Sequence, residues 1–182
     1  AACLDMDLVA REIVAPGSSA LIGIRDAFGD DFLLPDATLN RRKLGRVVFA
    51  DPGALKLLNS ITHPELVLKA QEWLQQLEES HSPPPVAVID AAVLIESGLD
   101  SLVDAIVVTV ANAELQAERI AARDGISYED ALCRVNAQQP VEQMVARADC
   151  VIRTDCPLDD TVRQVDELWN ILVGDAGNAR SS

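Results

Sequence analysis

Residues 82–98 read SPPPVAVIDAAVLIESG, and this stretch decides the fold class. Its three prolines end whatever helix precedes them, because proline lacks the N–H group that a helix interior requires. A continuous apolar run follows at residues 86–89 and ends at Asp90. Such a run is typical of a strand that is covered on both faces. The stretch therefore predicts a parallel sheet with helices packed against it.

Three further apolar runs repeat this signal, at residues 1–5 (AACLD), 102–112 (LVDAIVVTVAN) and 148–155 (ADCVIRTD). Segments with helical spacing or helix caps separate them. Strands that alternate with helices predict an α/β fold with right-handed crossovers. The expected helices lie at residues 7–15, 112–125, 127–139 and 158–174, with two or three more within 52–79.

Several helix ends and one insertion are also predicted. Asn112 is a suitable N-cap and Gly125 a suitable residue to follow a helix end. Ser127, with an acidic residue three positions later, forms a weak capping box. Residues 16–82 contain no convincing strand, which predicts a helical insertion beside the sheet. The final residues, DAGNARSS, are expected to be disordered.

The charge balance narrows the possible partners. Fifteen basic and 29 acidic residues give a formal net charge of -14, and such a chain repels nucleic acids and anionic membranes. No apolar run approaches the roughly 20 residues that span a bilayer. The four cysteines form no CxxC pair, which predicts neither a zinc site nor a disulfide framework. We expect a cytoplasmic protein with no nucleic-acid or membrane partner, and a homo-oligomer is compatible with the sequence.

Asp5 and Asp7 follow the first strand, at the sheet edge where ligands of parallel sheets bind. Two carboxylates there can hold Mg2+ or remove a proton from a hydroxyl. The alternative is that Asp7 only caps the next helix, because a carboxylate satisfies free amides at a helix start. Asp90 follows another strand and is a further candidate for supporting Mg2+.

Basic residues gather at two places in this acidic chain. The cluster at residues 41–46 is either a phosphate anchor or a solvated helix face. Gln116, Arg119 and Arg123 share one helix face, where guanidinium groups can neutralise a transferring phosphoryl group or form intrahelical ion pairs. His63 precedes a proline, and a structural role between helices is its simpler interpretation.

Five stretches of the chain carry motifs in a characteristic order. They are DMDLVAREIVAPGSSAL (5–21), TLNRRKLGRVVFADPGALKLLNSITHP (38–64), AAVLIESGL (91–99), LQAERIAARDGISYEDALCRVNAQQP (115–140) and ARADCVIRTD (146–155). Together they resemble the dephospho-coenzyme A kinase family over nearly the whole chain. The family is a P-loop kinase with a nucleotide-binding core, a helical substrate domain and a lid. The resemblance implies a three-layer, P-loop-kinase-like α/β fold with a parallel sheet, a helical substrate-binding insertion and a helical lid. The implied parts are a core of 1–19, 83–112 and 143–173, a substrate subdomain of 20–82, a lid of 113–142 and a tail of 174–182.

The resemblance also implies the reaction and the residues that perform it. The γ-phosphoryl group of ATP, with Mg2+, passes to the ribose 3′-hydroxyl of dephospho-CoA, with Asp7 as general base and Arg119 as the lid arginine. The implied acceptor-binding residues are Asp5, Arg11, Arg41, His63 and Glu96. The implied ATP-side residues are Arg123, Arg153 and Thr154, with Asp90 for the metal ion.

The sequence departs from the family pattern in three ways. It contains no G-x-x-x-x-G-K-[ST] loop, so either the first strand, loop and helix of the family precede Ala1 or the protein lacks them. The second possibility predicts a non-catalytic relative that binds a CoA-like ligand or a partner protein. Ala92 replaces a proline of the family, and Thr154 and Cys156 replace Asn and Gly beside the expected adenine site. A nucleotide or nucleoside kinase with another acceptor is a third interpretation.

Overall fold

The structure, a computed structural model, describes the backbone of residues 1–136 and 141–179 and the side chains of these residues up to 174. The chain divides into two compact units, Ala1–Leu102 and Val103–Ser182, and each is described by itself. The implied division into core, insertion and lid stays a prediction. Within the described part, no helix has the length and apolar character needed to cross a bilayer.

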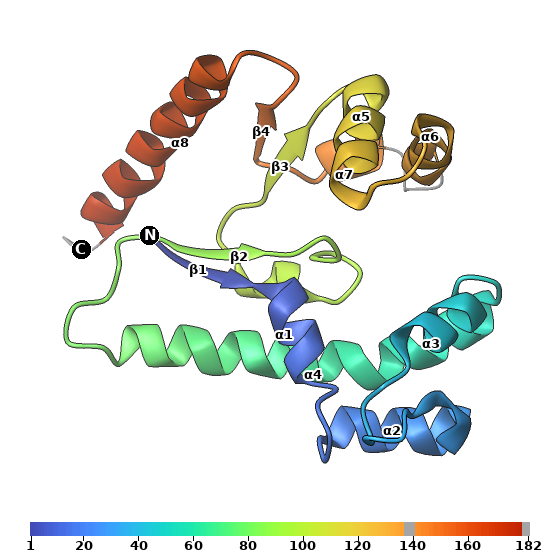
Figure 1. The fold of residues 1–182 in the computed structure, drawn as a ribbon. Coiled ribbons are helices and arrows are strands. Elements are labelled where there is room, and N and C mark those ends of the chain that lie inside the picture. The colour runs from blue at the N-terminus through green and yellow to red at the C-terminus, as the bar shows by residue number, and fades with distance from the viewer. Residues whose placement is uncertain (137–140, 180–182) are drawn as a thin grey trace. The chain divides into compact units, whose positions relative to one another are not determined.

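The first unit contains two of the four predicted strands, β1 (Ala2–Asp5) and β2 (Ala87–Asp90), which pair in parallel (Figure 1). Their register places Cys3 beside Val88 and Leu4 beside Ile89. Leu4 and Ile89 pack against the hydrophobic core, whereas Cys3 and Val88 are exposed. The prediction that residues 86–89 are covered on both faces is therefore wrong for this structure, because the helical core of the unit covers one face of the pair.

Helices make up most of the rest of this unit (Figure 1). Ser18 caps the helix α2 (Ser19–Phe28) by accepting the Leu21 N–H, and Asn40 caps α3 (Arg41–Val48) by accepting the Lys43 N–H. Residues 16–82 contain no strand longer than an isolated bridge, as the predicted helical insertion requires. The elements are α1 (Met6–Glu12), α2 (Ser19–Phe28), the 3-10 helix η1 (Asp30–Phe32), α3 (Arg41–Val48), α4 (Pro52–Glu78) and the 3-10 helix η2 (Leu99–Leu102).

The longest of these helices, α4, corrects the prediction of two or three helices within 52–79. Asp51 caps its start by accepting the Gly53 N–H at 2.8 Å, and Pro52 occupies the first turn, where no N–H is needed. The helix then continues through Pro64, a residue that costs about 3 kcal/mol in a helix interior. Packing of Leu66 and Ala70 in the core offsets this cost, because burying a leucine contributes about 2 kcal/mol.

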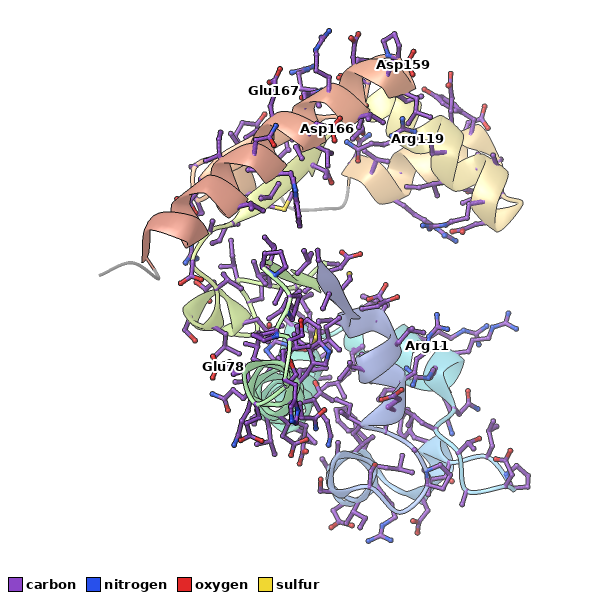
Figure 2. The ribbon with its side chains drawn as sticks, turned by 90° about the vertical axis from the view of Figure 1, so that its left-hand side faces the viewer. Arg11, Glu78, Arg119, Asp159, Asp166 and Glu167 are labelled. Carbon is purple, nitrogen blue, oxygen red and sulfur yellow. The ribbon has the colours of Figure 1, made fainter. Side chains whose placement is uncertain are left out.

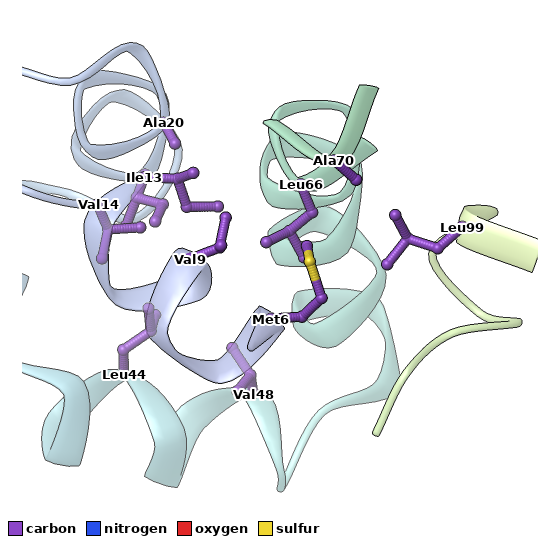
Figure 3. Packing of buried hydrophobic residues seen from close by; sticks show 11 residues of the cluster. Met6, Val9, Ile13, Val14, Ala20, Leu44, Val48, Leu66, Ala70 and Leu99 are labelled. Carbon is purple, nitrogen blue, oxygen red and sulfur yellow. The ribbon is translucent and has the colours of Figure 1, made fainter. Parts of the chain in front are cut away.

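The core of the first unit joins α4 to the helices that surround it (Figure 3). Met6 of α1 faces Leu66 of α4 in this view, and Leu44 of α3 and Ile24 of α2 are buried in the same cluster. Met6 lies between the two aspartates, and its burial therefore fixes the direction in which the backbone leaves β1.

The second unit holds the remaining strands, β3 (Val107–Val110) and β4 (Cys150–Arg153), which also pair in parallel. Asn112 caps the following helix by accepting the Leu115 N–H, and Gly125 ends it with a φ of 65°, so both predicted caps are confirmed. Ser127 accepts the Asp130 N–H, as its predicted capping role requires. The helices are α5 (Ala113–Asp124), α6 (Tyr128–Asn136), α7 (Val141–Val145) and α8 (Leu158–Ala179).

The end of α8 differs from the prediction. The α8 helix continues to Ala179, so the expected disorder from residue 175 is wrong as far as 179, while 180–182 lie outside the described residues. Extending an existing helix costs less than starting one, and this segment has no proline to stop it. Residues 137–140, part of the implied lid, also lie outside the described residues.

Candidate functional site

The two aspartates after β1 have different structural roles. The helix α1 begins at Met6, one residue earlier than expected, and Asp5 is its N-cap. The Asp5 Oδ1 atom accepts the backbone N–H of Asp7 at 2.8 Å and that of Leu8 at 3.2 Å. Asp7 is exposed, and its carboxylate has no hydrogen-bond or ion-pair partner among the described residues. The alternative that Asp7 is the helix cap is therefore wrong, and its carboxylate is available for chemistry.

A third carboxylate ends the neighbouring strand. Asp90 is the cross-strand partner of Asp5, so both residues end their strands at the same edge of the sheet. Among the described residues, no group of three or more metal-ligating side chains is close enough to enclose an ion. Asp5 and Asp90 are nevertheless two carboxylates at one sheet edge, and one or two carboxylates together with waters and substrate phosphates are the ligands that Mg2+ takes in proteins. Asp90 is exposed and is suited to be such a ligand.

Arg41, the first residue of α3, contacts the end of α1. Its Nη2 atom donates to the Arg11 carbonyl at 3.3 Å and approaches the Ala10 carbonyl at 3.5 Å. These carbonyls belong to the last turn of α1, where a helix has unpaired acceptors and its dipole favours a cation. Partial burial lowers the pKa of Arg41, and the nearby charge of Arg11 lowers it further.

Arg11 and Arg41 therefore form a pair of like charges. Arg11 lies in the last turn of α1 and appears as a stick in Figure 2. Neither guanidinium has an ion-pair partner in the part of the chain that the structure describes. Two neighbouring guanidinium groups without a carboxylate attract an anion, and planar Arg forks suit phosphate.

The rest of the basic cluster divides between structural and solvent-exposed residues. Lys43 donates to the Asp31 carbonyl at 2.8 Å and lies 5.0 Å from the centre of the Phe32 ring, so it holds α3 against η1. Arg42 and Arg46 are exposed and four residues apart on one face of α3. The interpretation as a solvated helix face thus fits Arg42 and Arg46, whereas Arg41 is held in place by α1.

An open groove of about 840 Å³ runs along α4 and contains two predicted site residues, His63 and Glu96. They come from different elements: His63 from the middle of α4, and Glu96 from the segment that follows β2. The groove itself was not predicted from the sequence, because its α4 face mixes apolar and polar side chains and gives no hydrophobic stripe. The signal that could have revealed it is the spacing of three and four between its members. These α4 residues are Pro52, Leu55, Lys56, Asn59, Ser60, His63, Pro64, Val67, Leu68 and Gln71.

In the second unit, the implied lid arginine, Arg119, is in direct contact with Thr154, one of the residues expected on the ATP side. The Arg119 Nη1 atom donates to the Thr154 hydroxyl at 3.0 Å, and its Nη2 atom donates to the Thr154 carbonyl at 2.6 Å. Thr154 follows β4, and its N–H donates to the Val110 carbonyl at the end of β3. Arg119, which is labelled in Figure 2, therefore links α5 to the carboxyl ends of both strands.

Arg153 and Asp155 organise the same loop. The guanidinium of Arg153 binds both carboxylate oxygens of Asp155, at 3.2 and 2.8 Å. Asp155 also accepts the Asn112 N–H at 3.2 Å. Burial raises the pKa of Asp155, but hydrogen bonding and charge from Arg153 outweigh it, so the net pKa is lowered. Cys156 is not among the residues with a positive φ, so its Cβ meets no backbone strain here.

Arg123 takes no part in the contact between Arg119 and Thr154. It forms an ion pair with Asp124 at 2.8 Å, and Asp124 also binds Arg134 of α6 at 2.9 Å. A structural ion-pair interpretation therefore fits Arg123, which contributes to joining α5 and α6. Gln116 donates to the Ala111 carbonyl at 2.7 Å, beside the start of α5.

Comparison with known proteins relates the chain to one family. The family model described as Dephospho-CoA kinase matches residues 1–160. A dephospho-CoA kinase of Streptomyces avermitilis is 40% identical over 173 residues, which cover 95% of this chain and 82% of that protein. A dephospho-CoA kinase of Geobacter sulfurreducens is 41% identical over 169 residues, with 93% and 85% of the two chains covered.

Solved structures agree with this relationship. The crystal structure of TT1252 from Thermus thermophilus is similar with a TM-score of 0.71 and 28% identity, over 94% of this chain and 84% of that one. The dephospho-CoA kinase from Campylobacter jejuni gives a TM-score of 0.65 and 25% identity, over 96% and 86% of the two chains. The predicted α/β, P-loop-kinase-like fold with parallel strands is thus confirmed. The chain belongs to the dephospho-CoA kinase family.

Proposed function

We propose that the protein transfers the γ-phosphoryl group of ATP to the ribose 3′-hydroxyl of dephospho-CoA, which yields ADP and CoA. The observation that carries this proposal is the unpaired carboxylate of Asp7 at the end of β1, next to the capping Asp5. Family membership supports the same reaction. No observation favours the non-catalytic alternative.

Asp7 is the proposed general base. Its carboxylate accepts the proton of the 3′-hydroxyl while the oxygen forms a bond to the γ-phosphorus and the bond to the β-phosphate oxygen breaks. A base needs a free lone pair within hydrogen-bond reach of the hydroxyl. The N–H of Asp7 is bound by Asp5, so the backbone beneath the carboxylate is fixed while the side chain stays unpaired.

The acceptor is bound by the first unit in this proposal. Arg11 and Arg41 are the proposed contacts for its diphosphate, because they are a guanidinium pair without a carboxylate partner among the described residues. His63 and Glu96 contact the acceptor from the groove on α4. Asp5 uses Oδ1 for its cap, which leaves its other oxygen for a substrate hydroxyl.

The donor side is assigned to Arg119, Arg153 and Thr154, with Arg123 as an outer contact. Arg119 supplies positive charge that stabilises the transferring phosphoryl group, and its bonds to Thr154 hold the guanidinium at the strand ends of its unit. Asp90 is the proposed protein ligand for Mg2+. When bound, Mg2+ neutralises charge on the phosphates.

A coupled assay of ADP release on the full-length protein, as its gene encodes it, tests the function. We expect ATP turnover that depends on dephospho-CoA and that adenosine or other nucleosides support far less well. Release of ADP at the same rate with every acceptor would favour a kinase of another specificity. No release with dephospho-CoA would overturn the proposal. A cytoplasmic location and the oligomeric state are separate predictions.

A further inference from the structure

The groove on α4 has a mixed and nearly neutral lining. Leu55, Val67 and Leu68 give it an apolar side, whereas Asn59, Ser60 and His63 supply polar atoms. Its charged residues are a single lysine, Lys56, and a single glutamate, Glu96. Its volume of about 840 Å³ lies within the range of about 300–1,000 Å³ that is usual for small-molecule sites.

Pro64 gives this groove an unusual hydrogen-bond acceptor. Proline has no N–H, so the carbonyl of Ser60, four residues earlier, lacks the donor that it would have in a regular α-helix. The nearby hydroxyls do not replace it: Ser60 Oγ donates to the Leu57 carbonyl at 2.7 Å, and Thr62 Oγ1 donates to the Leu58 carbonyl at 3.0 Å. Both Ser60 and Pro64 line the groove, so a carbonyl without its usual helical donor lies beside it.

The lining differs in kind from the Arg11–Arg41 pair. A phosphate is attracted by neighbouring guanidinium groups. A groove with balanced charges, apolar side chains and a carbonyl that lacks its usual helical donor suits a long uncharged ligand that carries amides. An amide N–H can donate to the Ser60 carbonyl, and methyl groups can contact Leu55, Val67 and Leu68. A proline kept inside a helix at a stability cost is itself typical of a functional position.

We propose that this groove binds the pantetheine arm of dephospho-CoA, with the Ser60 carbonyl accepting an amide N–H of the arm. The inference rests on the proposed function. It adds which part of dephospho-CoA binds at the groove and which part binds at the guanidinium pair. The arm is uncharged and carries amides, a hydroxyl, a pair of methyl groups and a terminal thiol, which matches the groove. The guanidinium pair then remains for the diphosphate that joins the arm to the adenosine.

Two leucines of α4 provide a matched test. Leu68 lines the groove and is 47% exposed, whereas Leu57 is 43% exposed on the same helix and does not line it. Leu68→Asp and Leu57→Asp introduce the same charge at similar exposure, so both variants should fold alike. Each is assayed in the full-length protein with dephospho-CoA and with adenosine 5′-monophosphate, an acceptor that has the 3′-hydroxyl but no arm.

The expected result is a KM for dephospho-CoA raised about 10-fold or more by Leu68→Asp, with kcat/KM for adenosine 5′-monophosphate unchanged. Leu57→Asp should leave both acceptors as in wild type. Pro64→Ala should also raise the KM for dephospho-CoA, because the restored N–H binds the Ser60 carbonyl, while thermal stability rises rather than falls.

The outcomes separate the two proposals. Equal effects of Leu68→Asp and Leu57→Asp, or equal effects of Leu68→Asp on both acceptors, would overturn the assignment of the arm while leaving the kinase function intact. A wild-type protein that phosphorylates neither acceptor would overturn the proposed function, and the groove assignment with it.

If adenosine 5′-monophosphate alone is inactive, competition by free pantetheine decides, and inhibition of wild type but not of Leu68→Asp supports the assignment. Equal inhibition, or none, overturns it.

Discussion

The Oδ1 atom of Asp5 accepts the backbone N–H of Asp7 at 2.8 Å, so the first aspartate of the pair holds the helix that carries the second. The two carboxylates, two positions apart in the chain, therefore have different structural roles. Asp5 satisfies free amides at the start of α1, and Asp7 keeps its carboxylate exposed. This division predicts different consequences for substitutions at the two positions.

Replacement of Asp5 tests the cap. Asp5→Ala should lower the free energy of unfolding by about 1 kcal/mol, because two amides of α1 lose their acceptor. Asp5→Asn keeps a side-chain oxygen and should retain most of that stability. Urea unfolding followed by circular dichroism measures both. Equal losses for Ala and Asn would show that the negative charge, and not the cap, stabilises this end.

Replacement of Asp7 tests the general base. Asp7→Asn should lower kcat by about 100-fold or more with little change in stability, since the amide cannot accept the proton. Asp159→Asn is the matched control, because Asp159 is also exposed in the first turn of a helix, α8 (labelled in Figure 2). The control removes the same favourable interaction with a helix dipole. Near-normal turnover of Asp7→Asn would remove Asp7 from the chemistry.

Replacement of Arg119 tests charge stabilisation. Arg119→Gln should lower kcat by about 1,000-fold, the order expected for loss of an arginine that stabilises a phosphoryl transition state. Arg119→Lys keeps the charge but cannot reach the hydroxyl and carbonyl of Thr154 with a planar fork, so it should restore only a small part of the rate. Steady-state kinetics at saturating ATP measures kcat. Arg163→Gln on α8 serves as the control, and a full rate for Arg119→Gln would contradict the assignment.

Acid should weaken the contact between α5 and α6 through Asp124. Hydrogen bonding from Arg123 lowers the pKa of Asp124, and the charges of Arg123 and Arg134 add to this effect. A carboxylate whose pKa is lower in the folded state stabilises the fold above its unfolded pKa, near 4, and loses that contribution as the pH falls through its folded pKa.

Thermal unfolding between pH 7 and pH 2.5 is the corresponding measurement. The difference in Tm between wild type and Asp124→Asn should be largest above about pH 4 and should shrink on further acidification. Solvent screens the exposed charges of this ion pair, so the difference in Tm should be small, and added salt should reduce it further. A difference that grows as the pH falls would contradict the lowered pKa.

Much of the local structure was predictable from the sequence. The four strands, the Asn112 and Gly125 caps and the helical character of residues 16–82 were all recognised, because each depends on residues close together in the chain. Apolar runs, cap side chains and glycine at a positive φ act over a few residues and keep their meaning in any fold. The motifs that indicated the kinase family are local in the same sense.

Other features depended on tertiary contacts. Whether Asp5 or Asp7 caps α1 was decided by the burial of Met6, and the continuity of α4 through Pro64 by core packing of Leu66. The contact of Arg119 with Thr154 joins residues 35 positions apart. The sequence alone thus determined which elements form and which family they belong to. Only the tertiary structure decided which carboxylate is free and which side chains share a groove, because contacts between distant segments set those energies.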